Sequence, residues 1–250
     1  MEFAIGFCIA IVIALTGVGA GVITAPLLIL FLHVPVDIAV STALAYSAIV
    51  KLIVVPFQVV RRQVNYRVLG IMLMGGLPGV IIGSVLFKHV ASHGPKAALY
   101  FVLGAIIIFT SAWHLFRHFK PAGIARPITE RPKWIAAIML PIGAEVGFSS
   151  SGAGALGTVA LLSLTSLTAA QVVGTDLSFG LGIALVGTGV HLVGGSYNSL
   201  LLIKLAAGGV VGGLIGSGAA PKIPNRNLRF ALSLWLLFIG LQFCYQAATR

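Results

Sequence analysis

Charged side chains are scarce in this chain of 250 residues: Asp, Glu, Lys and Arg together make up 8% of it, while hydrophobic residues make up 58%. An ordinary soluble domain carries roughly 25% charged residues, because its surface must be compatible with water. The scarcity removes soluble enzymes, nucleic-acid-binding modules and secreted disulfide scaffolds from the leading candidates. It predicts an all-α, polytopic membrane protein.

Cysteine and acidic residues are also few. Cys8 and Cys244 both lie in apolar runs and lack the spacing of a metal site or a disulfide framework. The balance of 16 Lys and Arg against 5 Asp and Glu would suggest nucleic acid in a soluble protein, but most of these cations lie in short loops between apolar runs, as the positive-inside bias predicts. We therefore expect a lipid bilayer around the chain, and no metal, cofactor or nucleic-acid partner. A homodimer is not indicated by the sequence.

The apolar runs have two distinct lengths. A helix of about 20 residues crosses the bilayer, so two of the runs are too long for one upright span. Each long run is interrupted by a cluster of small residues, at 16–21 and at 149–154. Glycine costs about 0.5–1 kcal/mol relative to alanine inside a helix, which favours a break, whereas small-residue helix packing is the alternative. The runs are 3–32, 36–60, 68–87, 97–117, 134–163, 169–193, 199–220 and 228–248.

The loop charges discriminate between two topologies. If each long run is one full span, the Lys and Arg residues of loops and tails divide 10 to 5 between the two sides, and if each is a re-entrant hairpin they divide 11 to 4. We prefer the hairpin topology because its bias is larger. It places both termini outside and the basic loop 117–133 in the cytoplasm.

The chain is similar to itself at a shift of 133 residues, which aligns 16–86 with 149–219 without a gap. The matches include polar residues such as Asn65 with Asn198, which an apolar composition does not explain. We predict two homologous repeats, 1–119 and 134–250, joined by a linker at 120–133. With a glycine-broken first helix and three full spans in each, the second repeat is inverted, as in secondary transporters with a site near the membrane midplane. Eight full spans would make the halves parallel.

The stretch from Gly17 to Leu28, Gly-Val-Gly-Ala-Gly-Val-Ile-Thr-Ala-Pro-Leu-Leu, resembles the glycine-rich first motif of the TauE/SafE family. These are permeases associated with sulfite, sulfonate and related sulfur anions. The resemblance covers nearly the whole chain, although Ala20 interrupts the usual run of three glycines and the second copy of the motif is serine-rich. It implies outward anion transport in a bacterial inner membrane, without fixing the substrate, because members of the family differ in it.

Helix starts at the two breaks would offer what an anion needs inside a membrane, because they carry free N–H groups and a partial positive charge. A hydroxyl near a break either binds the substrate or forms a hydrogen bond within its own helix. The threonines on the next helices, Thr42 and Thr175, either bind the substrate or pack between helices. The expected substrate-binding residues are Thr16, Gly17, Gly19, Gly21, Ser149, Ser150, Ser151, Gly152, Gly154, Thr42 and Thr175.

Ionisable residues inside the apolar runs are rare and costly. Asp176 and His191 share one face of 169–193, and the repeat-equivalent face of 36–60 carries Lys51. Lys51 either attracts the anion or forms a structural pair with Asp176. His191 either carries a coupled proton or is a solvated, interfacial histidine. Glu145 precedes the second break and is either a proton site or a cap for backbone amides.

These features predict a secondary transporter that exports small sulfur-containing anions, such as sulfite or organosulfonates, by alternating access. Asp176 and His191 are the candidates for proton coupling. A passive anion channel with the same pore is the alternative. An intramembrane enzyme is not expected, because no nucleophile motif accompanies the acid–base candidates, and the lack of a Walker-type loop speaks against direct ATP coupling.

Overall fold

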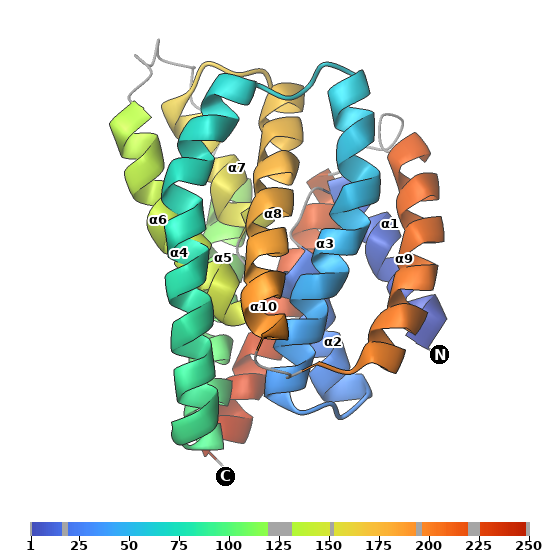
Figure 1. Ribbon diagram of the computed structural model, residues 1–250, viewed down its shortest axis with the longest axis vertical. Helices are drawn as coiled ribbons and strands as arrows, with labels where there is room; N and C mark the ends of the chain where they lie inside the picture. The colour runs from blue at the N-terminus through green and yellow to red at the C-terminus, as the bar shows by residue number, and fades with distance from the viewer. Residues whose placement is uncertain are drawn as a thin grey trace.

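A computed structural model of the chain describes residues 2–16, 20–119, 132–150, 153–193, 197–219 and 226–248 (Figure 1). Within these ranges the chain forms helices and no strand, so the prediction of an all-helical protein is confirmed. The helices are α1 (Glu2–Thr16), α2 (Ala20–Phe31), α3 (Val36–Val60), α4 (Tyr66–His93), α5 (Lys96–Phe119), α6 (Pro132–Ser149), α7 (Ala153–Leu164), α8 (Ala169–Leu192), α9 (Ser199–Ala219) and α10 (Arg226–Ala248).

Polar residues between the apolar runs set several helix starts. The side chain of Asn65 accepts a hydrogen bond from the Val68 N–H at 3.1 Å, and that of Asn198 accepts one from the Leu201 N–H at 3.0 Å. Thr168 forms a capping box at the start of α8. Because a cap satisfies a backbone donor that the helix itself leaves free, these residues fix the boundaries of α4, α9 and α8.

Helix length separates two classes of element. Five helices are long and apolar enough to cross a membrane: α3, α4, α8, α9 and the part of α10 from Phe230 to Ala248. α5, with 24 residues, also has the length of a crossing helix. In contrast, α1, α2 and α7 have 15, 12 and 12 residues, which is too short to cross. Each long apolar run of the sequence therefore contains two shorter helices, α1 with α2 and α6 with α7.

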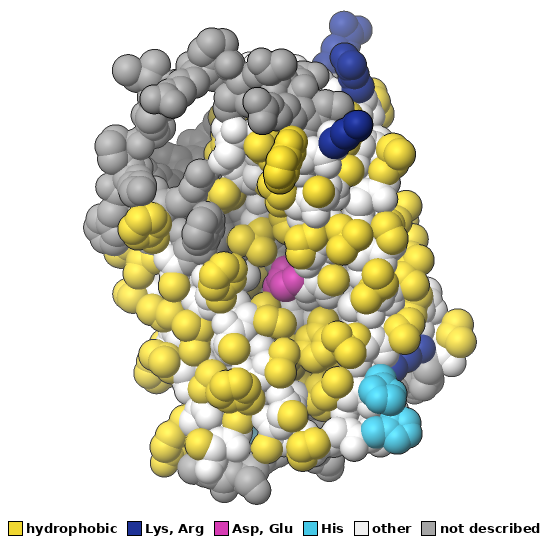
Figure 2. Space-filling model, turned by 90° about the vertical axis from the view of Figure 1, so that its left-hand side faces the viewer, with side chains coloured by type: hydrophobic (Ala, Val, Ile, Leu, Met, Phe, Trp, Pro, Cys, Tyr) yellow, Lys and Arg dark blue, Asp and Glu magenta, His cyan; other side chains and the backbone are white. Residues whose placement is uncertain are grey.

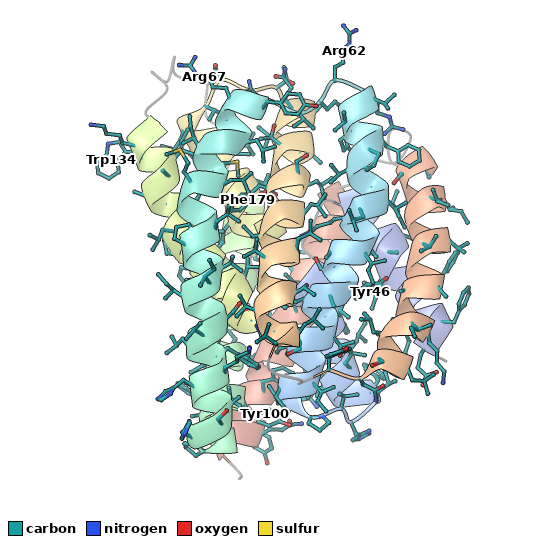
Figure 3. The ribbon with its side chains drawn as sticks, viewed as in Figure 1. Tyr46, Arg62, Arg67, Tyr100, Trp134 and Phe179 are labelled. Carbon is teal, nitrogen blue, oxygen red and sulfur yellow. The ribbon has the colours of Figure 1, made fainter. Side chains whose placement is uncertain are left out.

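The helices run in opposing directions (Figure 1). α3 and α9 run upward, whereas α4 and α8 run downward. α1 starts toward the lower end and α2 returns there to join α3, while α6 starts at the upper end and α7 returns there to join α8. Arg62 and Arg67 project from the upper end (Figure 3), and both chain termini lie toward the lower end. The two short pairs thus enter the molecule from opposite ends.

Contacts between helices recur at a fixed spacing in the sequence. A Cβ atom at Gly75 of α4 would meet the carbonyl oxygen of Ala136 on α6, and one at Gly208 of α9 would meet the carbonyl oxygen of Phe3 on α1. Each residue of the first pair stands 133 positions from its counterpart in the second. α4 therefore packs on α6 as α9 packs on α1, in both cases between the two halves of the sequence.

Two buried aromatic residues follow the same spacing. Phe179 of α8 fills the space beside Gly76, and Tyr46 of α3 fills the space beside Gly209 (Figure 3). Both aromatic side chains are fully buried. Tyr46 thereby packs α3 onto α9, and Phe179 packs α8 onto α4. The helices α3 and α8 also lie against each other.

The sides of the molecule are apolar. In the face that Figure 2 shows, hydrophobic side chains cover the middle, and Lys and Arg gather chiefly at the upper end. Large apolar side chains such as Met74, Phe238 and Tyr245 are more than half exposed. Such a surface suits lipid rather than water, which agrees with a multi-pass membrane protein.

Candidate functional site

The ends of the two short helix pairs meet inside the molecule. Gly21 lies in the first turn of α2, and Ser150 lies between α6 and α7. A Cβ atom at Gly21 would overlap the carbonyl and the hydroxyl of Ser150, so only glycine fits at this contact. Ser150 itself has a φ of 64°, a left-handed conformation that is uncommon for residues other than glycine.

Two hydroxyl groups near the short pairs have no hydrogen-bond partner among the described residues. One is Oγ of Ser150, which is 4% exposed, and the other is Oγ1 of Thr42, which is fully buried on α3, the helix that packs along α2. An unsatisfied buried hydroxyl costs about 1–3 kcal/mol, so each of these atoms would gain from a ligand that accepts or donates a hydrogen bond.

The remaining residues predicted at the breaks are placed differently. Ser149 donates a hydrogen bond to the carbonyl of Glu145 within its own helix at 2.9 Å, which is the alternative that the sequence left open for such hydroxyls. Gly154 lies in the first turn of α7. Gly17, Gly19, Ser151 and Gly152 lie outside the described residues, as does the side chain of Thr16.

Thr175 belongs to an interhelical contact. Its Oγ1 accepts a hydrogen bond from the Asn65 N–H at 3.0 Å, at the connection between α3 and α4. This is the packing alternative for Thr175. Its repeat-equivalent Thr42 has no such bond, so the two threonines do not play the same part.

Lys51 and Asp176 are both buried, with exposed fractions of 3% and 2%. The Asp176 carboxylate accepts a hydrogen bond from Thr158 Oγ1 of α7 at 2.9 Å, and it leaves no space for a Cβ atom at Gly157. Lys51 interacts with Asp176 electrostatically, yet no ion pair within 4.0 Å joins them within the described part of the chain. Lys51 is thus buried on α3 and interacts with Asp176 across a distance longer than 4.0 Å.

His191 is buried rather than interfacial, with an exposed fraction of 2%. Its Nδ1 lies 2.8 Å from Oγ of Ser41 on α3, and its Nε2 lies 3.1 Å from the carbonyl oxygen of Gly147 on α6. The ring also packs on Phe87 of α4, with 5.4 Å between ring centroids. Of the alternatives considered for His191, a solvated side chain does not fit, because three other helices cover this position near the end of α8.

Glu145 lies on α6, one turn before the interruption, and is half-buried. Its Oε1 accepts a hydrogen bond from Ser149 Oγ at 3.3 Å. This contact holds the carboxylate beside the end of α6. It favours neither of the two roles considered for Glu145, the proton site and the backbone cap.

Sequence reasoning missed Ser41 and Thr158, which bond His191 and Asp176. Neither residue lies in a motif, and each meets its partner only through helix packing. No sequence pattern indicated a cavity of about 660 Å³ that is lined by residues of α2, α3, α4, α5 and α10, among them Asp37, Tyr100 and Gln246. Tyr100 lies toward the lower end of the molecule (Figure 3). Among the described residues, no group of three or more His, Cys, Asp or Glu side chains is placed to hold a metal ion.

Comparison with known proteins identifies the family. A family model described as "Sulfite exporter TauE/SafE" matches residues 2–243. The chain is 29% identical to the Bacillus subtilis (strain 168) protein "Probable membrane transporter protein YjnA" over 95% of this chain and 96% of the relative. It is 24% identical to "Probable membrane transporter protein YunE" of the same strain, over 93% and 92% of the two chains. No solved structure matches significantly. The chain belongs to the TauE/SafE family of membrane transporters.

Proposed function

We propose that the chain is a secondary transporter that exports small sulfur-containing anions, such as sulfite or organosulfonates, from a site between its two interrupted segments. The contact between Gly21 and Ser150 carries this proposal, because it brings the start of α2 next to the end of α6, three residues before α7 begins. Helix starts favour anions through their free N–H groups and partial positive charge. The family description supports the class of substrate.

Three buried groups of the described chain suit an oxyanion. Ser150 and Thr42 each supply a buried hydroxyl without a partner among the described residues, and an anion oxygen would accept from both. Lys51 supplies a buried positive charge that would offset the cost of bringing an anion into the membrane. We infer that these groups, with the helix starts, form the substrate site near the membrane midplane.

The tight contact between the two segments supports alternating access. Because the Ser150 backbone occupies the space next to Gly21, an anion enters between them only when the two short helix pairs move apart. An inverted repeat provides two equivalent ways of parting, one toward each side of the membrane. The opposite entry of the short pairs and the contacts that recur after 133 positions support this arrangement.

We further propose that the end of the molecule from which Arg62 and Arg67 project faces the cytoplasm of a bacterium, that the linker 120–133 is cytoplasmic, and that the chain lies in the inner membrane. The gathering of Lys and Arg at this end supports the orientation through the positive-inside bias. A reporter fused after Arg250 tests it. Periplasmic activity is expected, and a cytoplasmic tail would contradict the inverted topology.

Flux in reconstituted vesicles tests the function. We expect saturable uptake of labelled sulfite or sulfoacetate, with counterflow, which a passive channel does not show. The uptake should fall in Gly19→Val and in Gly152→Val. It should persist in the control Gly70→Val, since a side chain at Gly70 meets nothing within 4 Å. Wild-type flux in both test variants would remove the glycine clusters from the mechanism.

A further inference from the structure

His191 is held between two acceptors by fixed contacts. The carbonyl oxygen of Gly147 can only accept a hydrogen bond, so Nε2 of His191, 3.1 Å away, carries a hydrogen atom. Nδ1 faces Oγ of Ser41 at 2.8 Å, and the same Oγ lies 2.8 Å from the carbonyl oxygen of Asp37, one turn earlier in α3. The ring therefore connects α8 to both α3 and the end of α6.

The charge of the ring decides how many hydrogen atoms are available for the contacts of His191 with Ser41 and of Ser41 with Asp37. If His191 is neutral with Nε2 protonated, Nδ1 is an acceptor, and the single Ser41 hydroxyl hydrogen must serve either Nδ1 or the Asp37 carbonyl. If His191 is protonated at both nitrogens, Nδ1 donates to Ser41, and Ser41 donates to Asp37. The contacts therefore fit both forms of the ring, and in the charged form Nδ1–H has an acceptor in Ser41 Oγ.

We propose that His191 is the proton-binding site that couples anion movement to proton movement. This inference rests on the proposed function. Gly147, which the ring contacts, lies three residues before Ser150 in the interrupted segment. An anion bound at that segment attracts the charged ring, so anion and proton favour each other's binding and cross the membrane in the same direction.

The helices that contact the His191 ring carry charged side chains of both signs. Burial of the ring opposes a charge on His191 most strongly, the hydrogen bond to Gly147 favours it, and Lys88 of α4, which donates to the carbonyl of Val190, also opposes it. The carboxylates of Asp37 on α3 and Glu145 on α6 are the acidic groups on the helices that contact the ring, and α7 contributes no ionisable side chain. Because these influences oppose one another, we propose that the negative charge of an arriving anion favours protonation of His191.

A path for the proton lies next to this site. Asp37, whose carbonyl accepts from Ser41, also lines the cavity of about 660 Å³. A cavity of this size with polar residues such as Gln242 and Gln246 in its wall has room for water. Ser41 lies one helical turn from that wall, so it stands between the cavity and the ring.

The test measures protons and anions together. Vesicles containing the protein and a trapped pH-sensitive dye receive a gradient of labelled sulfite or of isethionate, a sulfonate that stays unprotonated at neutral pH. The wild-type protein should move protons with isethionate in the same direction. His191→Gln keeps a donor toward Gly147 and copies Gln58, its counterpart in the other repeat, but it cannot take up a proton. We expect its proton-to-anion ratio to fall at least about tenfold, because glutamine cannot be protonated at this position.

Two further variants complete the test. Ser41→Ala removes the acceptor for Nδ1–H of the charged ring and should lower the ratio, by about tenfold for the loss of one charge-assisted hydrogen bond. His89→Gln is the matched control, because His89 is exposed on α4, and its ratio should stay unchanged.

Each result decides a different claim. Isethionate movement without protons in the wild type, or an undiminished ratio in His191→Gln, would overturn the coupling and leave transport intact. If His191→Gln does not reconstitute, an unchanged ratio in Ser41→Ala overturns the coupling. Vesicles that move neither sulfite nor isethionate would overturn the proposed function, and the coupling with it.

Discussion

The carbonyl and hydroxyl oxygens of Ser150 lie where a side chain at Gly21 would begin, so the two interrupted segments of the chain touch at backbone distance. The contact joins α2 to the end of α6 across the two halves of the sequence. If an anion passes between these segments, as we propose, the contact must open and close in each cycle.

Gly21→Ala tests the closed contact. The added methyl group meets the Ser150 backbone, which cannot rotate away, so we expect a loss of stability of about 1–3 kcal/mol, as for overpacking in a core. Anion flux should fall by at least tenfold, since the closed state is needed in every cycle. Thermal unfolding in detergent and flux in vesicles measure the two effects.

The control for that variant is Gly189→Ala on α8, where an added Cβ has nothing within 4 Å. It should keep wild-type stability and flux. Equal behaviour of Gly21→Ala and Gly189→Ala would show that the segments do not touch in the working protein.

Much of the fold was accessible from the sequence because it depends on local patterns. Apolar runs of span length predicted the crossing helices, whereas the residues at the centres of the glycine and serine clusters, 17–19 and 151–152, lie outside the described residues. The shift of 133 residues paired Gly75 with Gly208, and both glycines lie against backbone carbonyls of another helix. Such glycines can be predicted from the sequence because a close contact between two helices leaves little room for a larger side chain.

The contacts of the candidate site were not accessible in the same way. His191 was assigned to a helix end, yet its partners Ser41 and Gly147 stand 150 and 44 positions away in the sequence. Thr175 was paired with Thr42 by the repeat, but Asn65 satisfies only Thr175. Burial and hydrogen bonding at such positions depend on how whole helices pack, which periodicity within one helix does not encode.

The repeated glycine contacts predict paired effects. Gly75→Val and Gly208→Val should each push one helix pair apart, α4 from α6 and α9 from α1, and each should destabilise the protein by about 1–3 kcal/mol. Thermal unfolding of the purified variants measures this. The controls Gly70→Val on α4 and Gly218→Val on α9, which face open space, should be neutral. Strongly unequal effects of the first two variants would argue against equivalent helix packing.

Lys51 and Asp176 allow a test of pairing against anion attraction. Because no ion pair within 4.0 Å joins these two described residues, the variants Lys51→Met and Asp176→Asn should show a coupling in unfolding free energy below about 1 kcal/mol. Lys51→Met alone should lower anion flux by at least about tenfold, since it removes a buried positive charge.

The matched control is Lys204→Met, which removes an exposed lysine paired with Glu2 at 3.4 Å and should change flux little. If the double variant of Lys51 and Asp176 recovered the stability or the flux lost in the single variants, the two residues would be a structural pair. Lys51 would then have no separate role with the anion.

The most direct measurement of the central claim is protection of residue 150 by substrate. Ser150→Cys is introduced after Cys8 and Cys244, the free cysteines, are replaced by serine. An anionic, thiol-specific reagent is then applied to vesicles with and without isethionate. We predict that the new thiol reacts and that isethionate slows the reaction at least about tenfold, by occupying the same site, while acetate does not. A thiol that never reacts, or one that reacts equally fast with and without isethionate, would contradict an anion site between the two interrupted segments.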